Sequence, residues 1–439
     1  MKVLSIKIGG FKNISMTKIN FERISALVSL NNYGKSNIIE GLDFSIDFLT
    51  ASQKQRKTMM EWTKAIPINK NLENENFYFE IEFHEKMLKN FQYVKYGYSF
   101  AWNKNKISGK IIDEWLELRD SESSKYSSFL KRKESKYRKG KNTNAFRKIN
   151  LDYNQLAIDV LSSINDTDIS GVIKVIKNIK YRNCSAIDST DCFQTIPIEF
   201  LKNDSTTFEY DDIPKALYLM KKNSKERFKM FEDAISTLFP EFESISIGNY
   251  DISKKLEMNL VKLSSEKNIS NEDILPFKIK DEVYKLYIKT KYLNQPLDIS
   301  LMSTGTKRIF WLLANVLGAE SNNISLLGIE ELETSIHPRL LKNLLEILNT
   351  EIVNTSIIIS SHSPFLIQYL KLPQIYLGVP NKHGIAQFMA IPEKNHKKII
   401  ANSEDSNASV GEYIFNLASG DDDSLETLKY YIGVSNEHI

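Results

Sequence analysis

The stretch ALVSLNNYGKSNIIEGL at residues 26–42 places the strongest constraint on the fold. It reads as an apolar strand ending near Ser29, a polar loop ending in Gly34, Lys35 and Ser36, and a segment with apolar residues at helical spacing. A phosphate-binding loop requires this order, because backbone N–H groups and a helix N-terminus then face the phosphate oxygens. Ser29 stands where the usual G-x-x-x-x-G-K-[ST] pattern has its first glycine. The tripeptide alone is therefore a weak signal, with an accidental match as the alternative.

Two adjacent acids supply a second feature. In SLLGIEELETSIHP, Glu330 and Glu331 follow an apolar run that predicts a buried strand. Carboxylates at the end of a buried strand are costly unless a positive group faces them. Mg²⁺ with a triphosphate meets this need, and the alternative is that the acids cap the helix predicted from about Pro338. Together with Lys35 and Ser36, they favour a Mg²⁺–nucleotide site in which the lysine supplies charge and the hydroxyl binds the metal.

Two further polar segments fit such a site. Ser303, Thr304 and Gly305 form a small turn before an apolar helix, where N–H groups and a hydroxyl can face an anion. The alternative is simple N-capping by Ser303 or Thr304. His362 follows the apolar strand in TSIIISSHSPFLI, a position suited to contacting a γ-phosphate. The alternative there is a structural histidine.

Hydrophobic periodicity predicts an α/β fold in three segments. Residues 1–120 alternate as strands, including an N-terminal meander whose last strand at 24–29 leads into the loop. Residues 121–240 read as an insertion, first rich in Ser, Lys and Arg and then helical. Residues 241–439 contain two successive strand and helix alternations, which favour a parallel sheet with crossover helices.

Composition excludes several other classes. The chain has 439 residues, 42% hydrophobic and 26% charged, and lacks an apolar run near the roughly 18 residues that span a bilayer. The N-terminus alternates like a strand and does not resemble a signal peptide, so we expect a soluble cytoplasmic protein. Cys184 and Cys192 match neither a zinc knuckle nor a disulfide scaffold and are expected to be reduced thiols. A net charge of +3 does not by itself indicate a nucleic-acid partner.

Residues 125–148 are the one strongly basic segment. Ten Lys or Arg accompany one Glu there, and the interleaved aromatic residues are Tyr126, Phe129, Tyr137 and Phe146. Cations mixed with aromatic rings suit a phosphate backbone with stackable bases. The equally weighted alternative is a solvated hairpin or loop, so nucleic acid is a possible partner only.

In chain order, the motifs NNYGKSN, STGTKR, IEELETSIHP and SSHSPFLI resemble those of ABC-type ATPase heads of the SMC/RecF/OLD branch. Within that branch, the closest likeness is to stand-alone AAA ATPases of bacterial anti-phage and abortive-infection systems. The likeness covers most of the chain, including FKNI at 11–14, and is weakest from about 120 to 210. It implies an ABC-type P-loop NTPase head with a mixed or parallel sheet, crossover helices, an N-terminal antiparallel β-subdomain and a helical insertion.

The resemblance also implies residue roles at an ATP site shared between two subunits. Lys35 would bind the β- and γ-phosphates, Ser36 would ligate Mg²⁺, and Glu330 would hold that ion through a water. Glu331 would polarise the attacking water, and His362 would sense the γ-phosphate. The other residues implied to bind ATP are Asn31, Asn32, Gly34 and Asn37 in the loop, with Ser303 and Gly305 closing the site from the second subunit.

Two departures from the family pattern affect the expected activity. Ser29 replaces a glycine, and Glu330 replaces the more usual aspartate. A serine in a left-handed backbone would be strained by roughly 1 to 3 kcal/mol, whereas the longer glutamate still reaches a metal-bound water. We therefore expect ATP binding with slow hydrolysis.

The function that follows is an ATPase whose nucleotide-dependent self-association controls a separately encoded effector, in anti-phage defence. One alternative is a catalytically weak, nucleotide-gated scaffold, which Ser29 alone supports. Another is a RecF-like DNA-repair ATPase. An OLD-type nuclease is disfavoured, because the 77 residues after His362 lack a clear Toprim arrangement.

Overall fold

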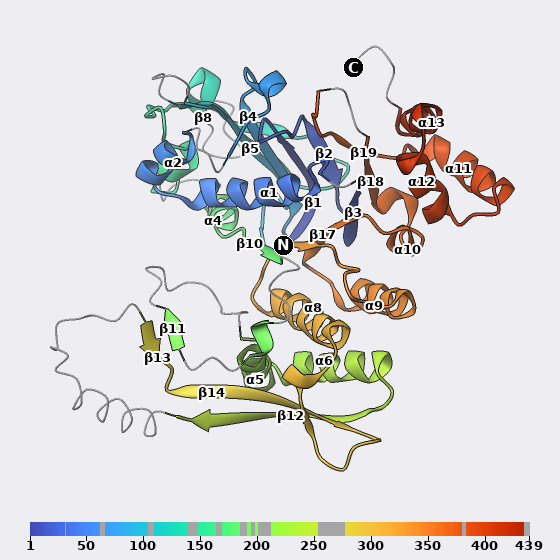
Figure 1. Ribbon diagram of the computed structural model, residues 1–439. Helices are drawn as coiled ribbons and strands as arrows, with labels where there is room; N and C mark the ends of the chain where they lie inside the picture. Colours follow the sequence, from blue (N-terminus) through green and yellow to red (C-terminus); the bar gives the residue numbers. More distant parts are fainter. Residues whose placement is uncertain are drawn as a thin grey trace, which may run out of the picture. The chain divides into compact units, whose positions relative to one another are not determined.

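The computed structural model divides the chain into two compact units (Figure 1). The first unit comprises Met1–Cys184, Asn323–Glu333 and Ile352–Ile439, and the second comprises Ser185–Asn322 and Thr334–Glu351. The predicted boundaries near residues 120 and 240 stay predictions. No helix among the described residues is long and apolar enough to cross a membrane. The structure describes residues 1–30, 32–61, 66–103, 109–137, 147–163, 169–184, 191–194, 198–200, 212–252, 277–379 and 383–433.

A six-stranded sheet positions the predicted site in the first unit. Its strand order is β10 (Tyr181–Cys184), β16 (Leu326–Glu330), β17 (Ser356–Ser361), β3 (Ile24–Val28), β18 (Ile375–Gly378) and β19 (Phe388–Ala390). The first five strands are parallel, and β19 pairs antiparallel with β18. Because parallel strands end at the same edge, the segments that follow β3, β16 and β17 meet there. This arrangement confirms the predicted sheet.

The predicted place of β3 was wrong. It is not the last strand of an N-terminal meander but lies between β17 and β18, parallel to both. All five of its residues are buried, which is the pattern of a central parallel strand without a solvent face. The short length of β3 made this pattern hard to distinguish from a meander strand.

An eight-stranded antiparallel sheet forms the rest of the β structure of the first unit. In spatial order its strands are β2 (Thr17–Asn20), β1 (Lys2–Gly9), β4 (Phe77–His84), β5 (Tyr93–Ala101), β6 (Lys110–Arg119), β7 (Ser127–Lys131), β8 (Lys136–Tyr137) and β9 (Arg147–Lys148). The predicted antiparallel subdomain is thus present. It extends beyond residue 120, through β7 to β9, into the segment predicted as an insertion.

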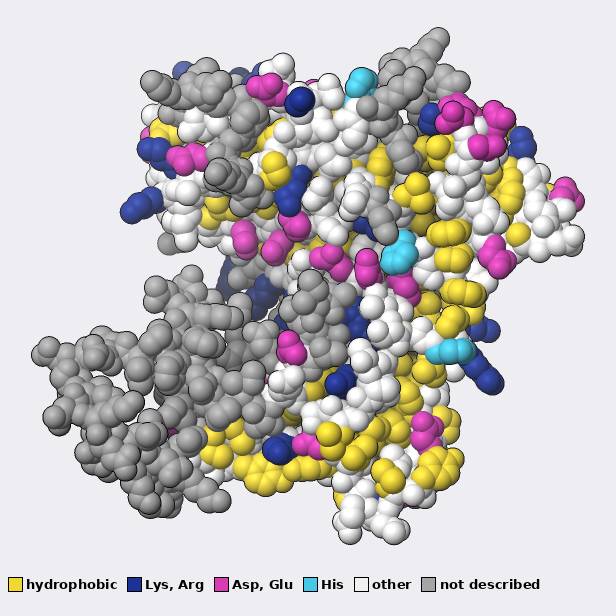
Figure 2. Space-filling view, in the orientation of Figure 1, with side chains coloured by type: hydrophobic (Ala, Val, Ile, Leu, Met, Phe, Trp, Pro, Cys, Tyr) yellow, Lys and Arg dark blue, Asp and Glu magenta, His cyan; other side chains and the backbone are white. Residues whose placement is uncertain are grey.

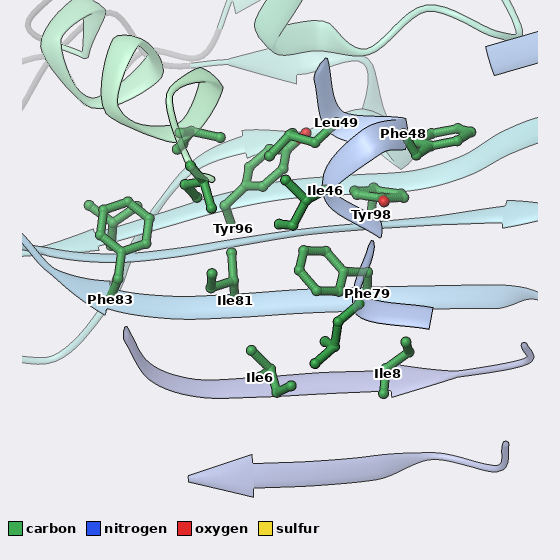
Figure 3. Close-up of a cluster of buried hydrophobic side chains, with 14 of the residues drawn as sticks. Ile6, Ile8, Ile46, Phe48, Leu49, Phe79, Ile81, Phe83, Tyr96 and Tyr98 are labelled. Carbon is green, nitrogen blue, oxygen red and sulfur yellow. The ribbon is translucent and has the colours of Figure 1, made fainter. Parts of the chain in front are cut away.

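Helix α1 (Lys35–Thr50) packs against both sheets. It contacts β10 and β17 of the parallel sheet and β1 of the antiparallel sheet. Its Phe48 ring stacks on the rings of Tyr98 and Phe100, with centroids 5.0 and 4.8 Å apart. Figure 3 shows Ile46, Phe48 and Leu49 of α1 beside apolar side chains of β4 and β5. Packing on two sides holds α1, and with it the loop at its N-terminus, in one orientation.

Two aromatic residues of the basic segment, Phe129 and Tyr137, belong to this core. Phe129 on β7 and Tyr137 on β8 are 1% and 7% exposed, and both strands lie inside the sheet with a paired strand on each side. The Tyr126 ring is covered by the Lys95 ammonium at 4.3 Å and the Arg119 guanidinium at 4.5 Å. These three rings are not available for base stacking, which corrects that expectation, and Phe146 lies outside the described residues.

Nucleic-acid binding through residues 125–148 therefore stays a prediction that depends on cations alone. One of these cations, Arg132, is buried and donates to the carbonyl oxygens of Gln155 (by Nη1) and Asp152 (by Nη2, at 2.7 Å). Arg132 thus has a structural role. Acidic and basic side chains are interspersed on the face of the molecule shown in Figure 2.

The second unit combines helices with a small antiparallel sheet. Its three-stranded sheet has the order β12 (Phe242–Asp251), β14 (Glu282–Thr290) and β15 (Leu297–Asp298), and β11 (Ile198–Phe200) pairs with β13 (Phe277–Ile279). Helices α5 (Ile213–Asn223) and α6 (Lys225–Leu238) pack on α8 (Thr304–Ser321), and α6 also contacts α9 (Pro338–Glu351). Helices α5 and α6 confirm the helical pattern predicted for the later part of residues 121–240.

The remaining described elements are short or C-terminal. Helix α3 spans Ala157–Leu161. Cys184 and Cys192 are buried and form no disulfide bond. The other elements are α2 (Gln53–Met59), η1 (Lys70–Leu72), η2 (Arg132–Glu134), α4 (Ser170–Lys177), η4 (Asp191–Phe193), η5 (Ile299–Leu301), α10 (Pro364–Ile367), η6 (Leu372–Gln374), α11 (Glu393–Asp405), α12 (Val410–Ser419) and α13 (Asp422–Ile432).

Glu114 on β6 is a fully buried carboxylate that joins the antiparallel sheet to α3. It accepts hydrogen bonds from the N–H groups of Ala157 (2.6 Å) and Ile158 (3.2 Å) and from the hydroxyl of Tyr96 (3.0 Å). Burial raises the pKa of Glu114 to about 7, although these bonds and Arg132 oppose the rise. The folded protein therefore keeps a proton on Glu114 in a pH range where the unfolded chain has released it.

We expect Glu114 to make the protein less stable as pH rises. Because its folded pKa lies above the unfolded value of 4.5, the free energy of unfolding should fall between that pH and about 7. The loss should reach about 3 kcal/mol relative to Glu114→Gln, which does not titrate. Urea unfolding of both proteins from about pH 5 to about pH 8 measures it. A stability difference that is constant over this range would contradict the prediction.

Candidate nucleotide-binding site

The backbone of the loop between β3 and α1 shows why Gly34 is required and why Ser29 is tolerated. Gly34 has φ 115°, and a Cβ there would lie 2.8 Å from the Ala386 Cβ and 2.9 Å from Asn13 Oδ1, so only glycine fits. Asn32 also has a positive φ, of 60°. Ser29, in contrast, does not adopt a positive φ, so its side chain causes no left-handed strain. The altered loop entrance is therefore an ordinary piece of backbone.

Lys35 begins α1 and turns back along the loop. Its ammonium donates to the carbonyl oxygens of Ser29 (2.8 Å) and Leu30 (3.0 Å), and the residue is 8% exposed. Burial lowers the pKa of Lys35, while the charges of Glu331 and Glu333 act to raise it. The loop thus holds a cation near the carboxylates of Glu331 and Glu333, which follow β16.

Ser36 and Glu330 meet directly although 294 positions separate them. The Ser36 hydroxyl donates to Glu330 Oε2 at 2.7 Å. The hydroxyl lies in the first turn of α1, which follows β3, and the carboxylate is at the end of β16. Both strands end at the same edge of the parallel sheet, with β17 between them. Glu330 therefore faces the loop. A hydroxyl and a carboxylate oxygen at this distance are a donor set that suits a hard cation such as Mg²⁺.

Glu331 and His362 lie side by side at the same sheet edge. His362 Nδ1 is 3.8 Å from Glu331 Oε1, and both side chains are about half exposed. The Glu331 backbone has φ 45°, and its N–H donates to the Ser360 carbonyl oxygen at 3.0 Å. A left-handed glutamate is uncommon and is a feature of functional sites. The turn directs the Glu331 side chain away from β16 and towards His362.

Two residues of this site were not predicted. Glu333 Oε1 accepts hydrogen bonds from the Ser361 hydroxyl (2.7 Å) and the His362 N–H (3.2 Å). Its only sequence signal is the third acid in the E-E-x-E run. Asn13 donates to the carbonyl oxygens of Tyr33 (3.4 Å) and Gly384 (3.1 Å), and thereby holds the loop. Its signal is the FKNI segment, to which no role was assigned.

The other predicted loop residues have different outcomes. Asn37 donates to Asn13 Oδ1 at 2.8 Å, so its amide fixes the loop from the α1 side. Asn32 is exposed. Asn31 lies outside the described residues. ATP binding by these three residues stays a prediction.

Ser303 and Gly305 belong to the second unit, where each has a local structural reason. Ser303 is the N-cap of α8 and accepts from the Thr306 N–H at 3.2 Å, as the capping alternative expects. A Cβ on Gly305 would lie 2.4 Å from the Ser335 carbonyl oxygen, so the close approach requires glycine. Closure of a partner's site by these residues stays a prediction.

The part of the chain that contains three of the four motifs matches a known family. Residues 211–368 match the family model described as "AAA domain, putative AbiEii toxin, Type IV TA system". No curated protein matches the chain. Among solved structures, the SMC head domain from Thermotoga maritima is 12% identical with a TM-score of 0.43, over 89% of this chain and 100% of that chain.

Two further solved structures are similarly distant. A structure of an SMC head bound to the C-winged helix domain of ScpA is 12% identical with a TM-score of 0.49, over 91% of this chain and 100% of that one. A structure of the recombination mediator protein RecF with ATPrS is 12% identical with a TM-score of 0.39, over 88% and 98%. Likeness at this level is too remote to carry an argument about activity. Over residues 211–368, however, the chain is similar to an AAA-type ATPase domain, the class that its own motifs indicate.

Proposed function

We propose that this protein binds Mg²⁺–ATP and slowly hydrolyses it to ADP and phosphate. The observation that carries the proposal is the hydrogen bond from the Ser36 hydroxyl to Glu330. It joins a phosphate-type loop to an acid at the end of β16, a parallel strand of the same sheet, at the edge where open α/β sheets bind ligands. Lys35 lies in the same loop and supplies the cation.

Each side chain then has a role that its position supports. Lys35 exchanges the carbonyl oxygens of Ser29 and Leu30 for phosphate oxygens. Ser36 and Glu330 hold Mg²⁺, which when bound neutralises phosphate charge. Glu331 accepts a proton from the attacking water, and His362 at 3.8 Å from it contacts the γ-phosphate.

We further propose that ATP drives self-association of this protein and that the assembly controls a separately encoded effector in anti-phage defence. The support is the resemblance of the four motifs, with Ser303 and Gly305 closing the site of a second copy. ATP can shift such an assembly only by binding one state more tightly than the other. The scaffold alternative has Ser29 as its only support, and because Ser29 has no positive φ the argument from backbone strain does not apply.

The metal role of Glu330 gives the test of this proposal. Purified protein should release phosphate from ATP with Mg²⁺ and not with EDTA. Glu330→Gln should require roughly 10- to 100-fold more Mg²⁺ for half-maximal ATP binding, because the amide has no negative charge and has an NH₂ group in place of one carboxylate oxygen. Titration with a fluorescent ATP analogue measures this shift. Glu75→Gln, at an exposed glutamate of the same unit, is the matched control. Metal-independent nucleotide binding by the parent protein would refute the proposal.

A further inference from the structure

Glu333 is a largely buried carboxylate at the candidate site. Its side chain is 10% exposed, compared with 45% for Glu331, although both lie within 3.8 Å of His362 Nδ1. Both distances join a glutamate Oε1 atom to His362 Nδ1. The imidazole therefore lies near two carboxylates of very different exposure, one from each side of Leu332.

A chain of hydrogen bonds connects Glu333 with the whole turn after β17. The Ser361 hydroxyl and the His362 N–H both donate to Glu333 Oε1. The Ser361 hydroxyl oxygen in turn accepts from the Ser363 N–H at 3.0 Å. Three successive residues, 361 to 363, are thus tied to one carboxylate oxygen. The position of this oxygen sets where His362 leaves the sheet.

The second oxygen of Glu333 is not explained by folding alone. Among the described residues, Glu333 Oε2 is buried and has no hydrogen-bond partner. Burying an acceptor without a partner costs roughly 1 to 3 kcal/mol. A glutamine would serve the Ser361 and His362 donors equally well without burying a charge. The contacts of Glu333 with the turn therefore depend on the place of Oε1 and not on the charge of the carboxylate.

We propose that Glu333 is a positioning residue for ATP hydrolysis, which holds His362 beside Glu331 through the acceptor atom Oε1. This inference rests on the proposed function for its kinetic part only. Glu333 acts through the turn at residues 361–363, whose contacts it organises, and the essential property is the place of its oxygen.

Two substitutions separate the place of the oxygen from the charge. Glu333→Gln keeps an acceptor at the same reach, so its turnover number should stay within about 3-fold of the parent. Glu333→Asp keeps the charge but withdraws the oxygen by one methylene, and misplacement of about 1 Å can cost as much as 100-fold. We expect Glu333→Asp to lose about 10- to 100-fold in turnover number, with the affinity for ATP unchanged.

A double-mutant cycle shows whether the effect passes through His362. In a His362→Ala background, Glu333→Asp should cost less than about 2-fold more, because the group that it positions is gone. The inference would be overturned if the losses of turnover in Glu333→Asp and His362→Ala were additive. It would also be overturned if Glu333→Asp kept the parental turnover number or if Glu333→Gln lost as much turnover as Glu333→Asp. Each outcome is interpreted after circular dichroism has shown that the variant is folded.

A spectroscopic measurement tests the same inference without nucleotide. The ring ¹⁵N signals of His362, identified by their loss in His362→Ala, should shift in Glu333→Asp and stay nearly unchanged in Glu333→Gln. If the parent protein fails to hydrolyse ATP but the ring signals behave in this way, the proposed function fails and the positioning inference stands. Unchanged ring signals in Glu333→Asp would overturn the positioning inference whatever the ATPase result.

Discussion

Glu331→Gln is expected to bind ATP as the parent protein does and to lose hydrolysis by roughly two to four orders of magnitude, the range for a positioned general base. The amide has the size of the carboxylate but cannot accept the proton of the attacking water. Glu331 is about half exposed and lies 3.8 Å from His362 Nδ1, so the substitution disturbs little packing. Single-turnover phosphate release measures the loss, and analytical ultracentrifugation should show a self-associated form that persists with ATP.

The same experiment distinguishes the two adjacent acids. If Glu330 holds the metal, it does not act as the general base. Glu330→Gln should therefore change the Mg²⁺ requirement before it changes the rate of hydrolysis. Parental hydrolysis by Glu331→Gln together with an inactive Glu330→Gln would reverse the assignment. Sedimentation of Glu331→Gln with ATP should also differ from that of the parent protein without ATP. If the two sediment alike, the proposed link between nucleotide and self-association is removed.

Lys35→Ala is expected to abolish Mg²⁺–ATP binding. The lysine is 8% exposed and its ammonium lies within the loop, so no other described loop residue replaces its charge. The substitution also removes the two hydrogen bonds to the carbonyl oxygens of Ser29 and Leu30, and Lys35→Met tests how much of the effect is lost packing. Isothermal titration with ATP and Mg²⁺ measures binding.

An exposed lysine of the same unit provides the control for this prediction. Lys54→Ala in α2 should bind ATP with parental affinity, because Lys54 is exposed. Thermal unfolding without nucleotide should show that Lys35→Met is folded. Unchanged ATP affinity in a folded Lys35→Met protein would remove the basis of the proposed function.

Much of the site could be predicted because its motifs are local. A strand, a glycine and a helix start are encoded within about ten residues, and the parallel sheet brings strand ends to one edge whatever the intervening chain does. The contact of Ser36 with Glu330 follows from these two facts. Glu333 was missed because its importance depends on its partners Ser361 and His362, which a distant strand supplies.

Local pattern was therefore sufficient for the α/β class, the order of the motifs and the candidate ATP-binding residues. Only the tertiary structure decided that β3 joins the parallel sheet, that Ser29 has an unstrained backbone, and that Phe129 and Tyr137 face the core. The physical reason is that periodicity reports which side of an element is apolar, but not which distant element covers that side. Strand pairing, backbone conformation and buried hydrogen bonds depend on which distant element packs there. Contacts between residues hundreds of positions apart determine that packing.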